Sequence, residues 1–323
     1  IIGRILGGLK ISHKILITGV GSYLPAKKLS NEDLSKFVDT SDEWISKRSG
    51  IKNRHFVSYN EHTSDMSLYA ANRAIENAKI SKNNIDLIIL ATTTPDNTFP
   101  STASLIQKKL KINAVSFDIQ AVCAGFIFAL SVAKSMMIDS NYKNCLVIGA
   151  DSMSKLLDWK DRSTSVLFGD GAGAIILQKF ENTEKQYEDW GILSNVIHTN
   201  GQFYDLLKTN GGVSSSQSTG FIEMEGKEVF KHAVEKLSTS LEEALQACNK
   251  QIIDINWLIP HQANQRILLA VADRLKIDPS KVISTLKNHG NTSAASIPLA
   301  LDDAISSNKI LNGDLIGLHA IGG

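Results

Sequence analysis

Residues 84–89 read NIDLII, and residues 253–259 read IDINWLI. Each run follows an amphipathic helical pattern and is rich in the apolar residues that form buried strands. The similarity continues downstream, because each run is followed by a predicted helix that ends in LKI, at 110–112 and at 275–277. The sequence therefore predicts two copies of one βαβαβ-type unit, and hence an α/β fold.

Strands and helices alternate throughout the first unit. We expect buried strands at 15–20, 87–92 and 145–150, and helices at 65–78, 101–110 and 126–137. This alternation favours a sheet of largely parallel strands. In the register of the repeat, the helix that starts at Cys123 matches the helix 293–306, and the strand 145–150 matches 315–318. Two related helix starts are then expected to face a common centre.

The composition limits the classes of function. Among 323 residues, 34 are Lys or Arg and 33 are Asp or Glu, so the net charge of +1 gives no global attraction to nucleic acid or to a membrane surface. No apolar run reaches the ~20 residues of a spanning helix. The cysteines at 123, 145 and 248 lack metal-ligand spacing, which favours free thiols, no metal and a cytoplasmic protein. We expect residues 1–11 to be an extension and not a secretory signal.

Cys123 is the strongest candidate for a nucleophile. It lies in the run QAVCAGF at 120–126, between a predicted strand and a predicted helix. A thiol at a helix start gains thiolate character, which suits acyl transfer through a thioester. The alternative is a small buried hydrophobic residue, the commonest role of a free cysteine.

His261 and Asn291 are the candidate partners of this cysteine. His261 follows the predicted strand 257–260, at the strand end where ligands gather in open α/β sheets, and Asn291 precedes the matching helix start. With Asn264, they supply neutral donors that can stabilise negative charge on a carbonyl oxygen. The alternative for His261 is a hydrogen-bonded core residue.

The glycine-rich run at 169–173 is not expected to bind phosphate. It is followed by β-forming residues and not by Lys-Ser/Thr and a helix. Close backbone packing beside an active site is the preferred interpretation.

Five runs carry a resemblance to a known family. They are DTSDEWI at 39–45, CAGF at 123–126, FGDGAGA at 168–174, HQAN at 261–264 and GNTSAAS at 290–296. With these runs the chain, from about Lys14 to Gly323, resembles the 3-oxoacyl-(acyl-carrier-protein) synthase III family, the condensing enzymes that start type II fatty acid synthesis. The resemblance implies a thiolase-like duplicated fold of five αβαβα layers, with halves at 14–180 and 181–323, and a homodimer.

The resemblance also implies a reaction. A short acyl-CoA, expected to be acetyl-CoA, loads Cys123, and malonyl-acyl-carrier protein then loses CO₂ and attacks the acyl group in a decarboxylative Claisen condensation. His261 and Asn291 match the family's catalytic His and Asn, and a related chain-elongating branch has a second His instead of the Asn. Backbone N–H groups of Cys123 and Gly323 match the oxyanion hole. CoA thioesters are substrates in this scheme, and no cofactor or metal is required.

Further roles follow from the resemblance alone. Trp44, Arg48, Arg162 and Asn264 match CoA-binding positions, and Lys231 and Arg266 match basic positions that dock the carrier protein. Phe99 matches a residue that reaches across the dimer and limits the primer pocket. A large residue there favours short primers.

Two alternatives remain open at this point. One is a related condensing enzyme of secondary metabolism. The other is a truncated, inactive homologue, because the family continues past Gly323 with a closing strand that this sequence lacks. On that basis we expect a fold without its last C-terminal strand, about ten further residues in the natural protein, and low stability or activity in this form.

Overall fold

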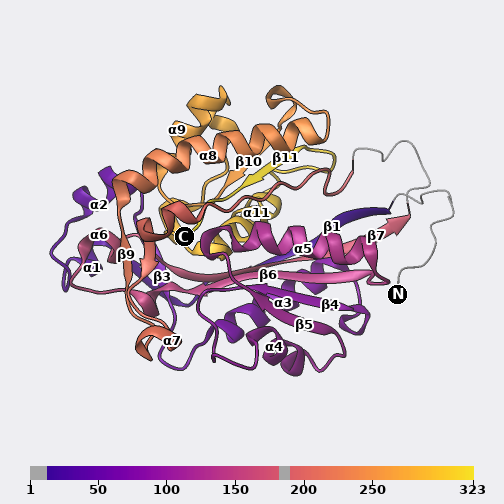
Figure 1. Cartoon of the computed structure of the whole chain (residues 1–323), viewed down its shortest axis with the longest axis horizontal. Helices are drawn as coiled ribbons and strands as arrows, with labels where there is room; N and C mark the ends of the chain where they lie inside the picture. Colours follow the sequence, from indigo (N-terminus) through magenta and orange to yellow (C-terminus); the bar gives the residue numbers. More distant parts are fainter. Residues whose placement is uncertain (1–12, 182–189) are drawn as a thin grey trace.

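The computed structural model describes residues 13–181 and 190–323. The predicted extension at 1–11 and most of the polar stretch after the first unit, at 182–189, lie outside the described residues. The chain forms alternating layers of helix and sheet (Figure 1). The order is helices, small sheet, helices, large sheet, helices, which is the five-layered α/β arrangement that the family resemblance implied.

The larger sheet has the strand order β1-β7-β6-β4-β5. Its strands are β1 (His13–Tyr23), β7 (Asp170–Glu181), β6 (Asn144–Ser152), β4 (Leu87–Ala91) and β5 (Val115–Ile119). β4 runs parallel to β5 and β6, as expected, but β7 runs antiparallel to both β6 and β1. The sheet is therefore mixed. The connection from β6 to β7 contains only short helical turns and not the long crossover helix that usually joins parallel strands.

Helices cover both faces of this sheet. α3 (Thr63–Ala78) and α4 (Thr102–Leu110) pack on one face, and α5 (Gly125–Asp139) and α11 (Ser296–Ser306) pack on the other. A Cβ atom at Gly19 of β1 would lie 2.3 Å from the Ala74 carbonyl oxygen in α3, so glycine is required for this close approach. Burial on both faces explains why the central strands are continuous Ile, Leu and Val runs.

The second unit repeats the order of the first. α8 (Gly226–Ala247) precedes β10 (Trp257–Pro260), α9 (Gln265–Leu275) follows, and a 3₁₀ turn leads into α11 and then β11 (Ile316–His319). β10 and β11 pair in parallel under α8 and α9. The expected strand at 282–284 makes only one bridge, between Val282 and Leu258. The order of elements therefore supports the duplication read from the sequence.

The remaining elements are short. They are β2 (Lys27–Ser30), β3 (Asn53–Phe56), β8 (Leu207–Thr209), β9 (Ile222–Met224), α1 (Asn31–Leu34), α2 (Asp42–Ser49), α6 (Arg162–Ser165), α7 (Val213–Ser216) and α10 (Leu286–His289). The fully buried Arg54 in β3 donates to Asn31 Oδ1 (2.7 Å) and to the Val166 carbonyl (2.8 Å). Asn31 in turn donates to Asp42 Oδ1 (2.8 Å), so these bonds tie α2 to the body of the protein.

α5 is unusually apolar. The window Val122–Asp139 is long and apolar enough to cross a membrane by length and composition alone. In the structure, however, α5 lies between the two sheets, and Phe126, Ala129 and Leu130 belong to the main core. The same test is passed by core helices of soluble proteins, and 39% of the Val122–Asp139 window is buried inside this protein.

Candidate active site

Cys123 lies in a 3₁₀ turn, Val122–Ala124, between β5 and α5. The φ angle of Val122 is +44°, a left-handed conformation that is rare for a β-branched residue. Strained turns of this kind concentrate at functional sites. The turn places Cys123 at the start of α5, as expected, and leaves the residue only 4% exposed.

The pKa of the thiol differs from the expectation. Burial raises the pKa of Cys123 to about 12; the Ser293 hydroxyl acts in the opposite direction, and the Asp151 carboxyl adds to the rise. A helix start favours the thiolate, but here desolvation of the charged form outweighs that effect. These buried surroundings favour the neutral thiol, and a group that accepts its proton would assist the reaction of the sulfur.

His261 is buried directly after β10. Its backbone N–H donates to the His319 carbonyl (2.8 Å), and its Nδ1 lies 2.7 Å from the Ser296 hydroxyl. Burial, together with His319, lowers the pKa of His261 to about 3. The imidazole is therefore neutral at pH 7 and has one N–H to donate.

Asn291 is held at both of its backbone groups. Its N–H donates to the Leu167 carbonyl and its carbonyl accepts from Gly169 N–H, both at 2.9 Å. Its side-chain Oδ1 accepts from Ser293 N–H (2.9 Å). Because the amide oxygen is engaged in this way, Nδ2 is the end of the side chain that is left to donate.

The segment 291–296 connects the three candidate residues. It begins with Asn291, its Ser293 hydroxyl is close enough to Cys123 to influence the thiol pKa, and its Ser296 hydroxyl holds His261. The 3₁₀ turn Ser293–Ala295 also packs directly against the turn that carries Cys123. Packing between the two units thus gathers groups that are far apart in the sequence.

The two turns are equivalent in the repeat. Each precedes an inner helix, α5 or α11, and each begins with a non-glycine residue of positive φ, Val122 (+44°) or Ser293 (+51°). The sequence register predicted that these helix starts face a common centre. The packing of the turns against each other agrees with that prediction.

The glycine-rich run lies beside this segment. Phe168 forms a parallel bridge with Asn291, and a Cβ atom at Gly169 would lie 2.4 Å from the His289 carbonyl oxygen. The run therefore serves close backbone packing, as the sequence indicated, and Asp170 accepts bonds from Val57 N–H and from Ser154.

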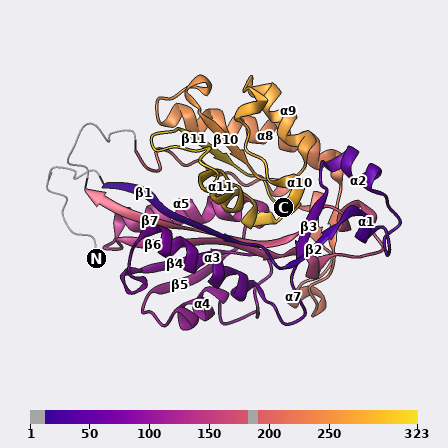
Figure 2. The ribbon, with the colours of Figure 1, turned by 180° about the vertical axis from the view of Figure 1, so that it is seen from behind.

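The C-terminal glycines reach the cysteine turn. A Cβ atom at Gly322 would lie 2.9 Å from the backbone N of Cys123, whereas one at Gly323 would lie 2.6 Å from the Leu207 carbonyl oxygen. Figures 1 and 2 both draw the C-terminal end at the level of the layer between the two sheets, and Gly322 and Gly323 are exposed there. The backbone of this segment is therefore adjacent to Cys123, and Gly322 is the residue that approaches the Cys123 backbone N.

Three of the residues matched to CoA binding lie together. The guanidinium carbon of Arg48 lies 4.3 Å from the centre of the Trp44 ring, and that of Arg162 lies 5.1 Å from it. Arg162 also pairs with Asp39 at 3.5 Å. Asn264 caps α9, which packs against α2, and its side chain accepts from Arg266 N–H (2.9 Å).

The two residues matched to carrier docking lie on helices that pack together, α8 and α9. The guanidinium carbon of Arg266 lies 5.6 Å from the ring centre of Phe230, the neighbour of Lys231. Lys231 is exposed and lies 3.8 Å from Glu228. The structure therefore brings both cations to one exposed face, with an acidic side chain beside them.

Phe99 is on the surface, with 83% of its area exposed.

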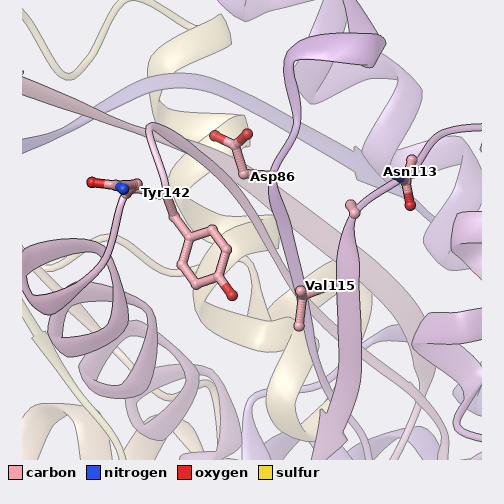
Figure 3. A pocket seen from close by; sticks show the side chains of 6 residues that line it. Asp86, Asn113, Val115 and Tyr142 are labelled. Carbon is pink, nitrogen blue, oxygen red and sulfur yellow. The ribbon is translucent and has the colours of Figure 1, made fainter. Parts of the chain in front are cut away.

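A pocket of about 400 Å³ lies between Asp86, Asn113, Val115 and Tyr142 (Figure 3). The pocket is at the amino ends of β4, β5 and β6, whereas Cys123 follows the carboxyl end of β5. This pocket is therefore at the opposite edge of the sheet from the candidate site. Within residues 13–181 and 190–323, no cluster of three or more His, Cys, Asp or Glu side chains is arranged to hold a metal.

Sequence reasoning missed three residues of the site: Asp151, Ser293 and Ser296. The two serines were inside the quoted run at 290–296, but small polar residues at a helix start are common and have no specific signature. Asp151 carried a usable signal, because it ends a buried strand at the sheet edge where ligands bind.

Comparison with known proteins gives one consistent result. Residues 117–201 match the family described as 3-oxoacyl-[acyl-carrier-protein] synthase III, and residues 245–323 match its C-terminal part. Beta-ketoacyl-[acyl-carrier-protein] synthase III of Wolbachia pipientis wMel is 53% identical over 96% of this chain and 96% of that protein. The enzyme of the same name from Ehrlichia canis is 54% identical over 95% of each chain.

Solved structures agree with these relatives. The 3-oxoacyl-[acyl-carrier-protein] synthase III of Aquifex aeolicus VF5 is 44% identical with a TM-score of 0.88, covering 97% of this chain and 96% of that one. The Pseudomonas aeruginosa PAO1 structure is 36% identical with a TM-score of 0.89, covering 96% and 94%. A priming beta-ketosynthase of the R1128 polyketide pathway is 31% identical with a TM-score of 0.86, covering 97% and 94%.

Proposed function

We propose that Cys123, His261 and Asn291 carry out the reaction of this chain, which belongs to the 3-oxoacyl-[acyl-carrier-protein] synthase III family. The chain has the thiolase-like fold and is an acyltransferase, the initiating condensing enzyme of fatty acid synthesis. One observation carries the assignment of residues. The segment 291–296 contacts the cysteine turn, contains Asn291 and holds His261 through Ser296.

In the first half-reaction, acetyl-CoA transfers its acyl group to Cys123. The sulfur attacks the thioester carbonyl, and negative charge develops on the carbonyl oxygen. Backbone N–H groups aimed at that oxygen stabilise the charge. We assign these donors to Cys123 and Gly323, and the contact of the adjacent Gly322 with the Cys123 backbone supports this assignment.

In the second half-reaction, malonyl-acyl-carrier protein loses CO₂ and its carbanion attacks the acyl group. The negative charge delocalises onto the malonyl thioester oxygen, where His261 and Asn291 donate hydrogen bonds. Neutral donors suit this task, because they stabilise the enolate without protonating its carbon. A Ser296 hydroxyl that donates to Nδ1 of His261 leaves the ring proton on Nε2 for the substrate.

This reaction needs no cofactor or metal beyond the CoA thioester substrates. A natural division of the chain has the nucleophile in a half at 14–180 and the His and Asn in a half at 181–323. The three free cysteines suit a reducing cytoplasm. Lys231 and Arg266 form the basic face for the acidic carrier protein.

A direct assay tests the proposal. Incubation with acetyl-CoA followed by intact mass measurement is expected to show one acetyl group on the protein, and addition of malonyl-acyl-carrier protein is expected to release a 3-oxoacyl product. Absence of an adduct from acetyl-CoA and from longer primers contradicts the proposal. A product formed only with a different acceptor indicates the secondary-metabolism alternative, which the polyketide relative represents.

Trp44 is proposed to stack on the adenine of CoA, with Arg162 on the other face and with Arg48 and Asn264 nearby. Because base–aromatic stacking contributes ~1–3 kcal/mol, Trp44→Ala is expected to raise the KM for acetyl-CoA about 5- to 100-fold. The kcat is expected to change little, because the adenine is bound equally in the ground state and the transition state.

Acetyl-pantetheine provides the matched control, because it has the reacting thioester but no nucleotide. Trp44→Ala and the wild type are expected to use it with the same kcat/KM. A loss that is as large with acetyl-pantetheine as with acetyl-CoA places the role of Trp44 somewhere other than adenine binding.

Phe99 is proposed to reach a partner's primer pocket in a homodimer. Two features support an interface on this side: the Phe99 ring is exposed, and β5 is the edge strand of the large sheet with Val115 exposed. Unpaired edge strands and exposed apolar side chains are typical of surfaces that a second chain covers.

Phe99→Ala is expected to shift primer preference toward longer acyl-CoA, because each additional buried methylene contributes ~0.8 kcal/mol. The measurement is the ratio of kcat/KM for six-carbon acyl-CoA to that for acetyl-CoA, at protein concentrations where the dimer is verified by light scattering. Tyr59→Ala, at another highly exposed aromatic, is the control. An unchanged ratio in a dimeric Phe99→Ala enzyme refutes the assignment.

A further inference from the structure

Asp151 is a fully buried carboxyl group that the reaction described above does not use. It lies in β6 near the carboxyl end, where its Oδ1 accepts from Thr93 N–H (2.7 Å) and from the hydroxyls of Thr92 (3.2 Å) and Thr94 (3.3 Å). Its Oδ2 accepts from Ala294 N–H (3.2 Å), in the turn before α11. All of these partners donate, which is the pattern of an ionised carboxylate.

The Ser293 hydroxyl is adjacent to both Asp151 and Cys123. It lowers the pKa of the carboxyl and of the thiol. The hydroxyl is buried and has no hydrogen bond of normal geometry within the described residues, an unusual condition for a polar atom. The backbone around it is fixed, because Ser293 N–H donates to Asn291 Oδ1 (2.9 Å).

The thiol and the carboxyl are coupled to each other. The Asp151 charge contributes to the raised pKa of Cys123, because two anions close together in a buried site are not both stable. Burial also raises the pKa of Asp151, which makes this carboxyl a better proton acceptor than one at the surface. The protonation state of one group therefore influences that of the other.

We propose that Asp151, acting through the Ser293 hydroxyl, takes the proton of Cys123 during acyl loading and returns it during condensation. The inference rests on the proposed function, because it requires Cys123 to be the acylated residue. Its geometric basis is the buried Ser293 hydroxyl without a hydrogen bond, in a turn that packs against the Cys123 turn and whose next residue, Ala294, donates its N–H to Asp151.

The step balances as follows. Cys123 Sγ bonds to the thioester carbonyl carbon, its proton moves to Ser293 Oγ, and the Ser293 proton moves to Asp151. The bond between the acyl carbon and the CoA sulfur breaks, and the CoA thiolate takes a proton from water. On condensation the bond to Cys123 breaks, the thiolate recovers its proton from Asp151 through Ser293, and Asp151 is again a carboxylate.

The pH dependence follows from the groups around Asp151. They are the loop 92–94 after β4, the turn Ser293–Ala294 before α11, and Cys123 before α5. Among these neighbours Cys123 is the titratable one. The wild-type loading rate is therefore expected to rise with pH as Asp151 ionises and then to level off below the pKa of the thiol.

Ser293→Ala provides the main test. General-base catalysis contributes about 10²–10⁴-fold, so this variant is expected to load acetyl-CoA at least ~100-fold more slowly at pH 7, in single-turnover assays read by intact mass. Its rate is expected to rise about tenfold per pH unit through pH 9, since only direct ionisation of the thiol remains. Decarboxylation of malonyl-acyl-carrier protein without primer is expected to stay within about twofold of the wild type.

Thr292→Val is the matched control, because it removes the neighbouring buried hydroxyl, which is also without a hydrogen bond in the described structure. It is expected to load with the wild-type rate and pH profile. Asp151→Asn is expected to behave like Ser293→Ala, and the double variant is expected to be no slower than the slower single variant, because the two groups act as one unit. If Asp151→Asn does not fold, Ser293→Ala decides alone.

Two outcomes would overturn the proton route and a third would overturn the proposed function, and the three can be told apart. A Ser293→Ala enzyme that loads at the wild-type rate with the wild-type pH profile refutes the proton route and leaves the proposed function intact. Equal losses of loading and decarboxylation show a purely structural role for Ser293 and also refute the route. A wild-type protein that gains no acyl mass refutes the proposed function itself.

Discussion

Cys123→Ala is expected to abolish acyl loading completely. The wild type should gain the mass of one acetyl group from acetyl-CoA, and the variant should gain none, because no other residue supplies the nucleophile that forms the covalent intermediate. Cys123→Ser should also show no adduct on the same time scale, since a hydroxyl is a much weaker nucleophile than a thiol near neutral pH. Intact mass spectrometry over a time course is the measurement.

Cys248→Ser is the control for this prediction. Cys248 is a half-buried free thiol whose sulfur contacts carbonyls of α8, and it is more accessible than the catalytic candidate. Its removal should leave loading unchanged. Acetylation that survives Cys123→Ala and disappears in Cys248→Ser would reverse the assignment of the nucleophile.

His261→Ala and Asn291→Ala are expected to separate the two half-reactions. Both variants should load Cys123 with acetyl-CoA, but each should lose about 10²–10³-fold in decarboxylation of malonyl-acyl-carrier protein, the usual cost of one oxyanion donor. The readouts are acetyl-enzyme by intact mass and release of CO₂ from labelled malonyl thioester.

The pH profile supplies an independent check. The folded-state pKa of His261 is lowered to about 3, so the imidazole is neutral and able to donate at every pH above roughly 4. Decarboxylation should show no step between pH 5 and 8 that depends on His261. Failure of a folded His261→Ala enzyme to load acetyl-CoA would instead make His261 the base for Cys123, and would also count against the route through Ser293.

Much of the fold was predictable from local pattern. The NIDLII and IDINWLI runs became β4 and β10 with their preceding 3₁₀ turns, because apolar stretches buried on both faces have a strong signal. The direction of β7 was not predictable in this way. Strand direction depends on the connection and on which neighbour the strand joins, and neither is visible in the residues of the strand.

The sequence likewise predicted some residues of the candidate site and not others. Cys123, His261 and Asn291 were recognisable because each chemical type stood at an element boundary, where the repeat predicted a common centre. Ser296, the partner of His261, was not recognisable. A serine at a helix start has the same local pattern whether it caps the helix or holds a distant imidazole.

The sequence alone was enough to predict most of the strands and helices of the two units and the candidate nucleophile and donors, since these depend on residue type and local periodicity, and its motifs carried the resemblance to the family. Only the folded structure revealed the raised pKa of Cys123 and the place of Ser293 beside Asp151. Asp151 and Ala294 are 143 positions apart and meet through packing of the two units. Burial and neighbouring charge set a pKa, and both exist only after distant segments have packed together.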